Sequence, residues 1–255
     1  MTDDEYKVIF LHFVKTGGSS IEDYFVKGDG YVETKFNLPD GKTKTVKEQH
    51  HFSSKQYIQT NGRDVWDYCF KFSFVRNPWD RIVSMYKWEE QVKNEPAMKS
   101  GALPFEKYCE YIYKAYHGIE SFDLIEGFVC NSIYRHMHHE KEKGHFISHY
   151  NKMYRNGEQI FDFIGKYENL AEDMQIVCDQ IGIINKPLPM INKTNHSGYR
   201  EYYSDESRQR IAEVYLEDID AYKESCDLAD NINPIELSEP ELEKFTTEQF
   251  IFQNF

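Results

Sequence analysis

The chain has 255 residues, which is long enough for one substantial hydrophobic core. It carries 43 acidic and 30 basic residues, for a formal net charge of -13. So acidic a chain is a poor surface for nucleic acid or anionic lipid, and we predict no nucleic-acid partner and no membrane insertion. No Pro-, Gly- or Ser-rich linker divides the sequence. We therefore predict one domain over residues 1–255, in which residues 226–255 form an acidic C-terminal extension.

Five cysteines occur without any Cys-x-x-Cys pair. This odd number predicts reduced thiols and a cytoplasmic location rather than a disulfide framework. The first residues, "MTDDEYK", are acidic and precede only a short apolar run. They predict neither a secretion signal nor a membrane span.

The first apolar segment, Val8 to Val14, is typical of a strand buried on both faces of a parallel sheet. It is followed by "KTGGSS" (residues 15–20), and a helix is expected from about Ser19. A Gly-rich turn that enters a helix directs several backbone N–H groups at one point, which predicts an anion site. The lysine precedes the glycines, unlike in a Walker A loop, so an ordinary ATP or GTP site is disfavoured. Taken alone, the glycines could instead serve only a tight, well-packed connection.

Residues 28–47 are polar and contain glycines, and we expect a surface excursion with a turn at "NLPDG". The strand–turn–helix pattern then recurs. Phe70 to Val75 predicts a strand, and "RNPWDRIVSMYKW" predicts a helix that Asn77 caps and Pro78 begins. Arg76 stands between them.

A third unit has a strand from Ile160 to Tyr167 and a helix that carries Leu170 and Ile181. Strands that alternate with helices predict an α/β domain whose ligand lies beyond the carboxyl ends of a mainly parallel sheet. Residues 102–150 are expected to be helical and aromatic. A late helix, Asp205 to Tyr222, is expected to have Ser204 as its N-cap.

These motifs together resemble the sulfotransferase superfamily, especially its carbohydrate-type branch, which includes heparan sulfate 2-O-sulfotransferases and small bacterial members. The resemblance runs over most of the chain and is carried by four stretches: Val14–Ser20, Phe74–Tyr86, Asp162–Met174 and Leu188–Tyr222. It implies a P-loop-like, three-layer α/β sandwich with a mainly parallel central sheet flanked by helices. It also implies the donor 3′-phosphoadenosine 5′-phosphosulfate (PAPS), the product 3′-phosphoadenosine 5′-phosphate (PAP) and no metal.

The resemblance assigns the 5′-phosphosulfate group to the first loop. The residues that it implies there are Lys15, Thr16, Gly17, Gly18, Ser19 and Ser20. The 3′-phosphate is assigned to Arg76 and Ser84, although an arginine at a strand end could also form a structural ion pair. Further contacts with the nucleotide are expected from Lys193, Tyr199 and Arg200.

Lys15 is expected to meet the negative charge that develops on the leaving oxygen. A base for the acceptor is expected from His51, with His50 as the alternative. Without the resemblance, a histidine pair in a loop is more often a surface feature than a catalytic one.

A histidine-dense stretch comprises His136, His138, His139, His145 and His149. It lacks a His-Glu-x-x-His spacing, so we predict no metal site. His145 and His149 would share one face if this segment is helical, and we expect them to line the acceptor site.

The sequence thus predicts a PAPS-dependent sulfotransferase that acts on a hydroxyl, or an amine, of a carbohydrate or small-molecule acceptor. Two rivals stay open: a small-molecule or nucleotide kinase with a variant phosphate loop, and a non-catalytic relative that binds the nucleotide. The sequence specifies neither the acceptor nor the oligomeric state.

Overall fold

The computed structural model describes residues 2–3, 7–25, 33–47, 51–91, 103–119, 133, 145–155, 158–191 and 197–224. Its central sheet has four strands in the order β1-β2-β5-β8. Their bounds are β1 Thr2–Asp3, β2 Val8–Phe10, β5 Phe70–Val75 and β8 Phe163–Lys166. β2, β5 and β8 run parallel, whereas β1 pairs antiparallel to β2. The predicted parallel sheet is therefore confirmed.

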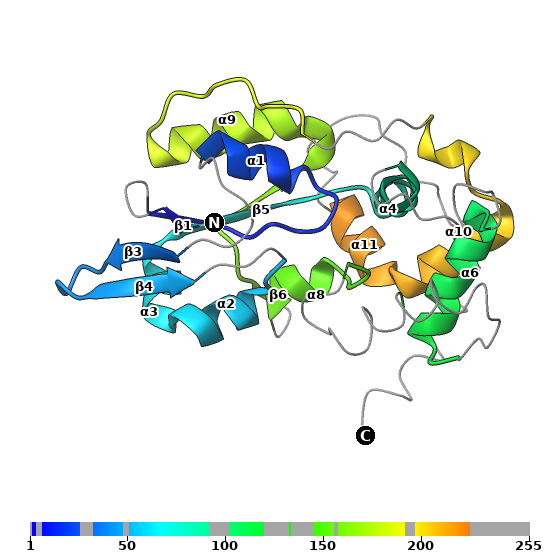
Figure 1. The fold of residues 1–255 in the computed structure, drawn as a ribbon, viewed down its shortest axis with the longest axis horizontal. Coiled ribbons are helices and arrows are strands. Elements are labelled where there is room, and N and C mark those ends of the chain that lie inside the picture. Colours follow the sequence, from blue (N-terminus) through cyan, green and yellow to red (C-terminus); the bar gives the residue numbers. More distant parts are fainter. Residues whose placement is uncertain are drawn as a thin grey trace.

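Helices and a hairpin cover the two faces of this sheet (Figure 1). One face packs against α1 (Gly18–Phe25) and α9 (Leu170–Ile181). The other face packs against the hairpin of β3 (Glu33–Asn37) and β4 (Thr43–Lys47), and against α2 (Ser54–Asn61), α3 (Arg63–Tyr68) and α8 (Tyr150–Met153). Val8 and Phe10 point to the first face and Ile9 to the second, as the alternation of a strand requires. The result is the predicted three-layer α/β sandwich.

A helical group extends the domain beyond the sheet (Figure 1). It consists of α4 (Pro78–Gln91), α6 (Phe105–Tyr116), α10 (Asp205–Val214) and α11 (Leu216–Glu224). These helices share a core that includes Trp79, Tyr108 and Tyr215. Short elements complete the described chain: β6 Tyr154–Arg155, β7 Glu158–Gln159 and the 3₁₀ turns η1 Tyr167–Asn169 and η2 Tyr199–Glu201.

Two predicted caps are confirmed. The Asn77 side chain accepts hydrogen bonds from the backbone N–H groups of Trp79 and Asp80, at 3.1 and 3.2 Å. Ser204 begins α10 with a capping box that it forms with Ser207. Each cap satisfies backbone donors that a helix start would otherwise leave without partners.

Two strands are shorter than predicted. β2 ends at Phe10 because the chain begins to turn early: Leu11 N–H still reaches the carbonyl of Phe72, but the Thr16 hydroxyl then closes a turn on the carbonyl of Phe13. β8 spans only Phe163–Lys166, and the 3₁₀ turn η1 replaces its predicted last residue.

The predicted surface excursion is partly wrong. Residues 33–47 form a hairpin around the expected turn, and Phe36 and Val46 are fully buried beneath the sheet. The single helix predicted over Asp205–Tyr222 is instead two helices, Asp205–Val214 and Leu216–Glu224. Its break lies at Tyr215, whose hydroxyl donates to the carbonyl of Phe146 and whose ring lies under the Arg81 guanidinium.

Several sequence-based expectations fall outside the described residues, among them the acidic extension 226–255 and most of the aromatic helical stretch after Ile119. In the part of the chain that the structure describes, no helix is both long and apolar enough to cross a membrane. Cys69, Cys109 and Cys178 are buried free thiols.

A buried ion pair joins the helical group to α8. Arg81 on α4 donates to Asp218 on α11 at 3.0 Å, and both side chains are almost inaccessible. Asp218 also accepts from the Ser148 hydroxyl and from the backbone N–H groups of His149 and Tyr150. One carboxylate thus holds three separate segments together.

We expect Asp218→Ala to lower the free energy of unfolding by about 3–5 kcal/mol, because Arg81 would keep a buried charge without its partner. Urea unfolding measures this. Asp67→Ala is the matched control, since Asp67 forms an exposed pair with Arg63 and should cost under about 1 kcal/mol. Equal effects of the two substitutions would contradict the role of Asp218.

Candidate active site

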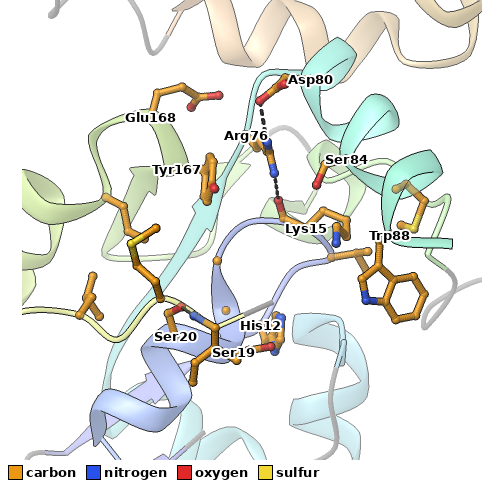
Figure 2. A pocket seen from close by; sticks show the side chains of 18 of the residues that line it. His12, Lys15, Ser19, Ser20, Arg76, Asp80, Ser84, Trp88, Tyr167 and Glu168 are labelled. Atoms are coloured by element: carbon orange, nitrogen blue, oxygen red, sulfur yellow. Dashed lines mark hydrogen bonds and ion pairs between the residues drawn. The ribbon is translucent and has the colours of Figure 1, made fainter. Parts of the chain in front are cut away.

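A cavity of about 490 Å³ lies at the carboxyl ends of β2, β5 and β8 (Figure 2). The turn after each strand contributes side chains to it: Lys15 after β2, Arg76 after β5 and Tyr167 after β8. The predicted residues that line it are Lys15, Gly17, Gly18, Ser19, Ser20, His51, Arg76, Ser84 and His145. The strand order therefore brings the two predicted anion sites into one cavity.

The first loop is held in an unusual backbone conformation. Lys15 has φ 64° and Gly17 has φ 79°. A left-handed non-glycine residue costs on the order of 1 kcal/mol or more and persists where its surroundings impose it. His51, across the cavity, is left-handed as well, with φ 65°. Lys15 and His51, two of the residues predicted to be catalytic, therefore have left-handed backbones, although remote Lys7 shares this feature.

Glycine is required at positions 17 and 18 for different physical reasons. Gly17 lies in the left-handed region, where glycine pays no steric penalty. A Cβ on Gly18 would lie 2.0 Å from the imidazole of His12, so the ring occupies the space that a side chain would need. His12 is held there by Glu22, at 3.1 Å. Close packing therefore accounts for Gly18, which the sequence left open.

The Lys15 ammonium lies 5.3 Å from the centre of the Trp88 ring. Burial and the neighbouring Arg76 guanidinium lower the pKa of Lys15 to about 8, while Glu89 opposes the shift. Thr16 follows it in sequence but is fully buried, and its hydroxyl donates to the carbonyl of Phe13 at 2.9 Å. The Thr16 side chain thus stabilises the loop rather than lining the cavity.

Arg76 is clamped from several sides (Figure 2). Its Nε and Nη2 each lie 2.8 Å from Oδ2 of Asp80, and its Nη1 donates to the carbonyl of Lys15 at 3.2 Å. The guanidinium also stacks on the ring of Tyr167, at 4.1 Å. The sequence left open an ion pair or a ligand contact for Arg76. The structure shows the ion pair and also places the side chain in the wall of the cavity.

Glu168 holds the turn that carries Arg76. Its Oε1 accepts from the backbone N–H of Asn77 at 2.8 Å, and burial raises the pKa of the carboxyl group. Ser84 lies on α4, which begins at that turn, and lines the cavity while buried almost completely.

Three imidazole rings form one end of the cavity. The His51 ring lies 4.8 Å from that of His12 and 5.1 Å from that of His145, which in turn lies 6.2 Å from Trp88. The Nδ1 of His51 is 3.1 Å from the carbonyl oxygen of His12. A carbonyl only accepts, so Nδ1 carries the hydrogen and Nε2 is the basic nitrogen. Burial lowers the pKa of His51 well below 6.5, and the nearby His12 lowers it further.

His149 lies apart from this cavity. It directly precedes α8, is buried against the ring of Phe13 at 5.1 Å, and contacts Asp218 through its backbone. Residues 145–149 are not helical, so His145 and His149 share no helix face. Of this pair, only His145 lines the cavity.

Tyr199 and Arg200 lie beside the Arg76 turn without lining the cavity. The Tyr199 hydroxyl is 3.5 Å from Nδ2 of Asn77, and the Arg200 guanidinium lies over the Tyr199 ring. Their segment is fixed at Tyr203, which donates to the carbonyl of Trp79.

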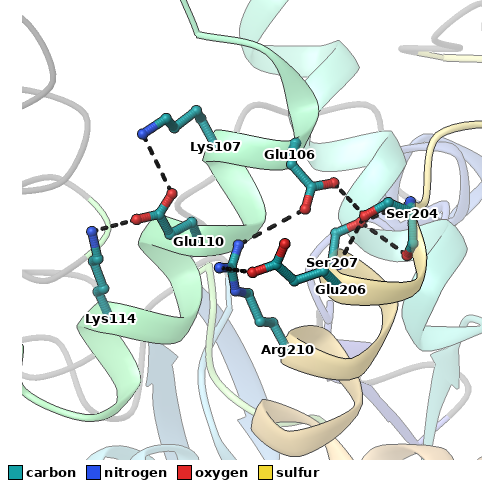
Figure 3. A network of polar contacts seen from close by, with 8 residues as sticks. All are labelled: Glu106, Lys107, Glu110, Lys114, Ser204, Glu206, Ser207 and Arg210. Atoms are coloured by element: carbon teal, nitrogen blue, oxygen red, sulfur yellow. Dashed lines mark hydrogen bonds and ion pairs between the residues drawn. The ribbon is translucent and has the colours of Figure 1, made fainter.

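The helix that follows this segment is tied to α6 by a polar network (Figure 3). The Ser204 hydroxyl donates to Glu106 at 2.7 Å and caps α10. Arg210, in the second turn of α10, pairs with both Glu206 and Glu106. The network fixes the start of α10, so the segment that carries Tyr199 stays beside the Arg76 turn.

Some predicted site residues fall outside the described part of the chain: His50, Lys193, His136, His138 and His139. Others were missed by the sequence-based prediction although they line the cavity: His12, Asp80, Trp88, Tyr167, Glu168 and the apolar segment 188–191. Helical spacing could have found two of these, because Asp80 and Trp88 lie four residues before and after Ser84 on the same predicted helix. Within the described residues, no cluster of three or more His, Cys, Asp or Glu side chains is arranged to hold a metal ion.

Parts of this chain are similar in sequence to known proteins. Carbohydrate sulfotransferase 10 of Xenopus laevis is 23% identical over 228 residues, which cover 83% of this chain and 62% of the relative. Carbohydrate sulfotransferase 12 of the same species is 26% identical over 149 residues, or 52% of this chain and 34% of the relative. An uncharacterized protein of Archaeoglobus fulgidus is 27% identical over 142 residues, or 55% of this chain and 90% of the relative.

The chain thus spans less than two thirds of the length of both carbohydrate sulfotransferases. A family model described as "Sulfotransferase family" matches residues 1–223, which contain the sheet, both predicted anion-site loops and all the described residues that line the cavity. The chain therefore belongs to the sulfotransferase family.

Proposed function

We propose that this protein transfers the sulfuryl group of PAPS to a hydroxyl group of a carbohydrate or another small acceptor. The observation that carries the proposal is the joint position of Lys15 and Arg76 in the wall of one cavity, linked by a hydrogen bond. Two cations so close together, in a protein of net charge -13, favour an anionic ligand.

The cavity suits a nucleotide with two charged ends. Its volume of about 490 Å³ lies within the range of roughly 300–1,000 Å³ that ligand pockets occupy. The backbone N–H groups at the start of α1 and the Ser19 side chain would hold the 5′-phosphosulfate. Arg76 and Ser84 would hold the 3′-phosphate. The apolar segment of Leu188, Pro189, Met190 and Ile191 offers a wall for the adenine ring.

The chemistry would divide between Lys15 and His51. The donor supplies a sulfur atom that is attacked in line, so that its bond to the bridging phosphate oxygen breaks as the new S–O bond forms. Nε2 of His51 would accept the proton of the acceptor hydroxyl. The Lys15 ammonium would stabilise the negative charge that builds up on the leaving oxygen.

The acceptor would enter at the end that His51, His145 and Trp88 form. An aromatic surface beside a base suits a sugar ring, whose apolar face packs on indole while a hydroxyl group points at the base. The names of the two Xenopus relatives agree with a carbohydrate acceptor.

Incubation with isotopically labelled PAPS and a panel of glycans, lipids, small alcohols and amines tests the proposal. Mass spectrometry should detect one added sulfuryl group on at least one hydroxyl acceptor. A parallel binding measurement with PAP and ATP separates sulfotransferase from kinase, because only PAP carries a 3′-phosphate for Arg76. Preferential binding of ATP would contradict the proposal.

Lys15→Met should lower kcat by about 100-fold or more, because one charge-stabilising donor is lost from the transition state. PAP binding, measured by calorimetry, should weaken much less, since the backbone N–H groups of the loop remain. Lys42→Met, at an exposed hairpin position, is the control. Near-wild-type turnover of Lys15→Met would refute the assigned role.

His51→Gln should lower kcat by about 100- to 10,000-fold while the affinity for PAP stays close to that of the wild type. The amide keeps much of the imidazole's shape but accepts no proton. His117→Gln serves as the control, because His117 pairs with Glu213 at the end of α6, away from the cavity. If His51→Gln keeps its turnover, another residue must be the base.

The rate should depend on pH through the same two groups. Lys15 must be protonated to act, so kcat should fall as the pH rises through about 8. His51 must be neutral, and its lowered pKa keeps the imidazole neutral down to a pH below 6.5. A pH series of kcat should therefore show a plateau around neutral pH that ends on the alkaline side near pH 8. A rate that still increased beyond pH 9 would contradict a protonated Lys15.

A further inference from the structure

We propose that Arg76 has a role besides anion binding: it is a positioning residue that holds the backbone of Lys15 in its reactive conformation. The inference rests on the proposed function, because it takes Lys15 as the group that stabilises the leaving oxygen. The hydrogen bond between Arg76 and the Lys15 carbonyl would connect the two anion sites, so that a change at one site would affect the other.

The link is a single hydrogen bond between the turns that follow two strands. Nη1 of Arg76 donates to the carbonyl oxygen of Lys15 at 3.2 Å (Figure 2). This bond spans 61 positions in sequence and bridges the turn after β2 and the turn after β5. The donor is charged and only 7% exposed, so the bond is stronger than one between neutral, solvated groups.

The backbone conformation of Lys15 requires a restraint of this kind. Its φ of 64° places a non-glycine residue in the left-handed region, which is unfavourable for an isolated chain. The carbonyl of Lys15 belongs to the peptide group that follows this strained residue. A hydrogen bond that fixes this carbonyl therefore fixes the direction in which the loop continues toward Gly17 and α1.

Arg76 is itself too constrained to follow the loop. Nε and Nη2 are held by Asp80 in the first turn of α4, and the flat face lies on Tyr167. A guanidinium group has five N–H donors, of which these contacts and the Lys15 carbonyl use three. Within the described residues no group accepts from the remaining two N–H groups, so they can donate to a phosphate. Arg76 can thus bind an anion and hold Lys15 at the same time.

A donor that lacks the 3′-phosphate separates the two roles. Adenosine 5′-phosphosulfate differs from PAPS only in this group, so Arg76 has no 3′-phosphate to bind. If Arg76 only binds the 3′-phosphate, Arg76→Gln should then turn over this donor as fast as the wild type. If Arg76 positions Lys15, Arg76→Gln should lower kcat by about tenfold or more with this donor as well, the equivalent of one charge-assisted hydrogen bond.

Arg63→Gln is the matched control. Arg63 forms the same type of i,i+4 pair, with Asp67, but on the exposed surface of α3. Its substitution should leave turnover with both donors unchanged. Thermal unfolding of both variants checks that each is folded before its kinetics are interpreted.

The pH profile tests a separate point, namely whether the Arg76 guanidinium acts on the Lys15 ammonium as a charge. The charges that act on the Lys15 ammonium come from Arg76 at the end of β5 and from Glu89 on α4. Removing the positive charge of Arg76 should move the alkaline limit of kcat to higher pH in Arg76→Gln. A variant that is merely less stable would keep the limit of the wild type.

A final measurement needs no donor. Hydrogen exchange of the backbone amides from Gly17 to Ile21 should be faster in Arg76→Gln than in Arg63→Gln. This comparison of hydrogen exchange tests the positioning role even if the wild type uses adenosine 5′-phosphosulfate too slowly to measure. Equal exchange in the two variants, or equal kcat of wild type and Arg76→Gln with the truncated donor, would overturn the positioning role. Failure of the wild type to transfer from PAPS would refute the proposed function instead, and hydrogen exchange would then stand as the test of the mechanical link.

Discussion

The parallel pairing of β2, β5 and β8 places the turns that follow these strands at one edge of the sheet. Val8 is opposite Phe70 and Phe10 is opposite Phe72, while Val75 is opposite Lys166. The three chains therefore leave the sheet in the same direction. This arrangement lets the Arg76 guanidinium reach the backbone carbonyl of Lys15. Arg76 also lowers the pKa of the Lys15 ammonium through charge repulsion, and Glu89 opposes this effect. Asp80 pairs with Arg76 on its other side.

The supporting helices hold this edge in place from outside. α4 starts at the Arg76 turn and carries Asp80, Ser84 and Trp88 along the same side, one helical turn apart. Its core-facing side carries Arg81, which is tied to Asp218 and so to α8. One helix thus connects the wall of the cavity with the buried polar centre of the helical group. A shift of α4 would disturb the packing and the site together.

Much of this arrangement follows from local patterns in the sequence. The strand after residue 69, the Asn77 cap and the glycines after Lys15 are signals within a few residues, and each predicted the observed element. The contacts that shape the site join residues that are far apart in the sequence, and local sequence patterns indicate them less clearly. Nothing near Gly18 in sequence indicates that the His12 ring fills the space beside it, and nothing near Arg76 points to the carbonyl of Lys15. The hairpin at 33–47 was missed because polar residues separate its buried side chains Phe36, Leu38 and Val46.

Helix α1 contacts two walls of the cavity. Its first turn faces the cavity, and its Ser20 hydroxyl accepts from the backbone N–H of Ile191 at 3.2 Å. Farther along, the Tyr24 hydroxyl accepts from the N–H of Lys186 at 2.9 Å. The apolar segment is therefore held by the same helix that follows the Gly-rich turn. Any displacement of α1 would consequently move both walls of the cavity as a unit.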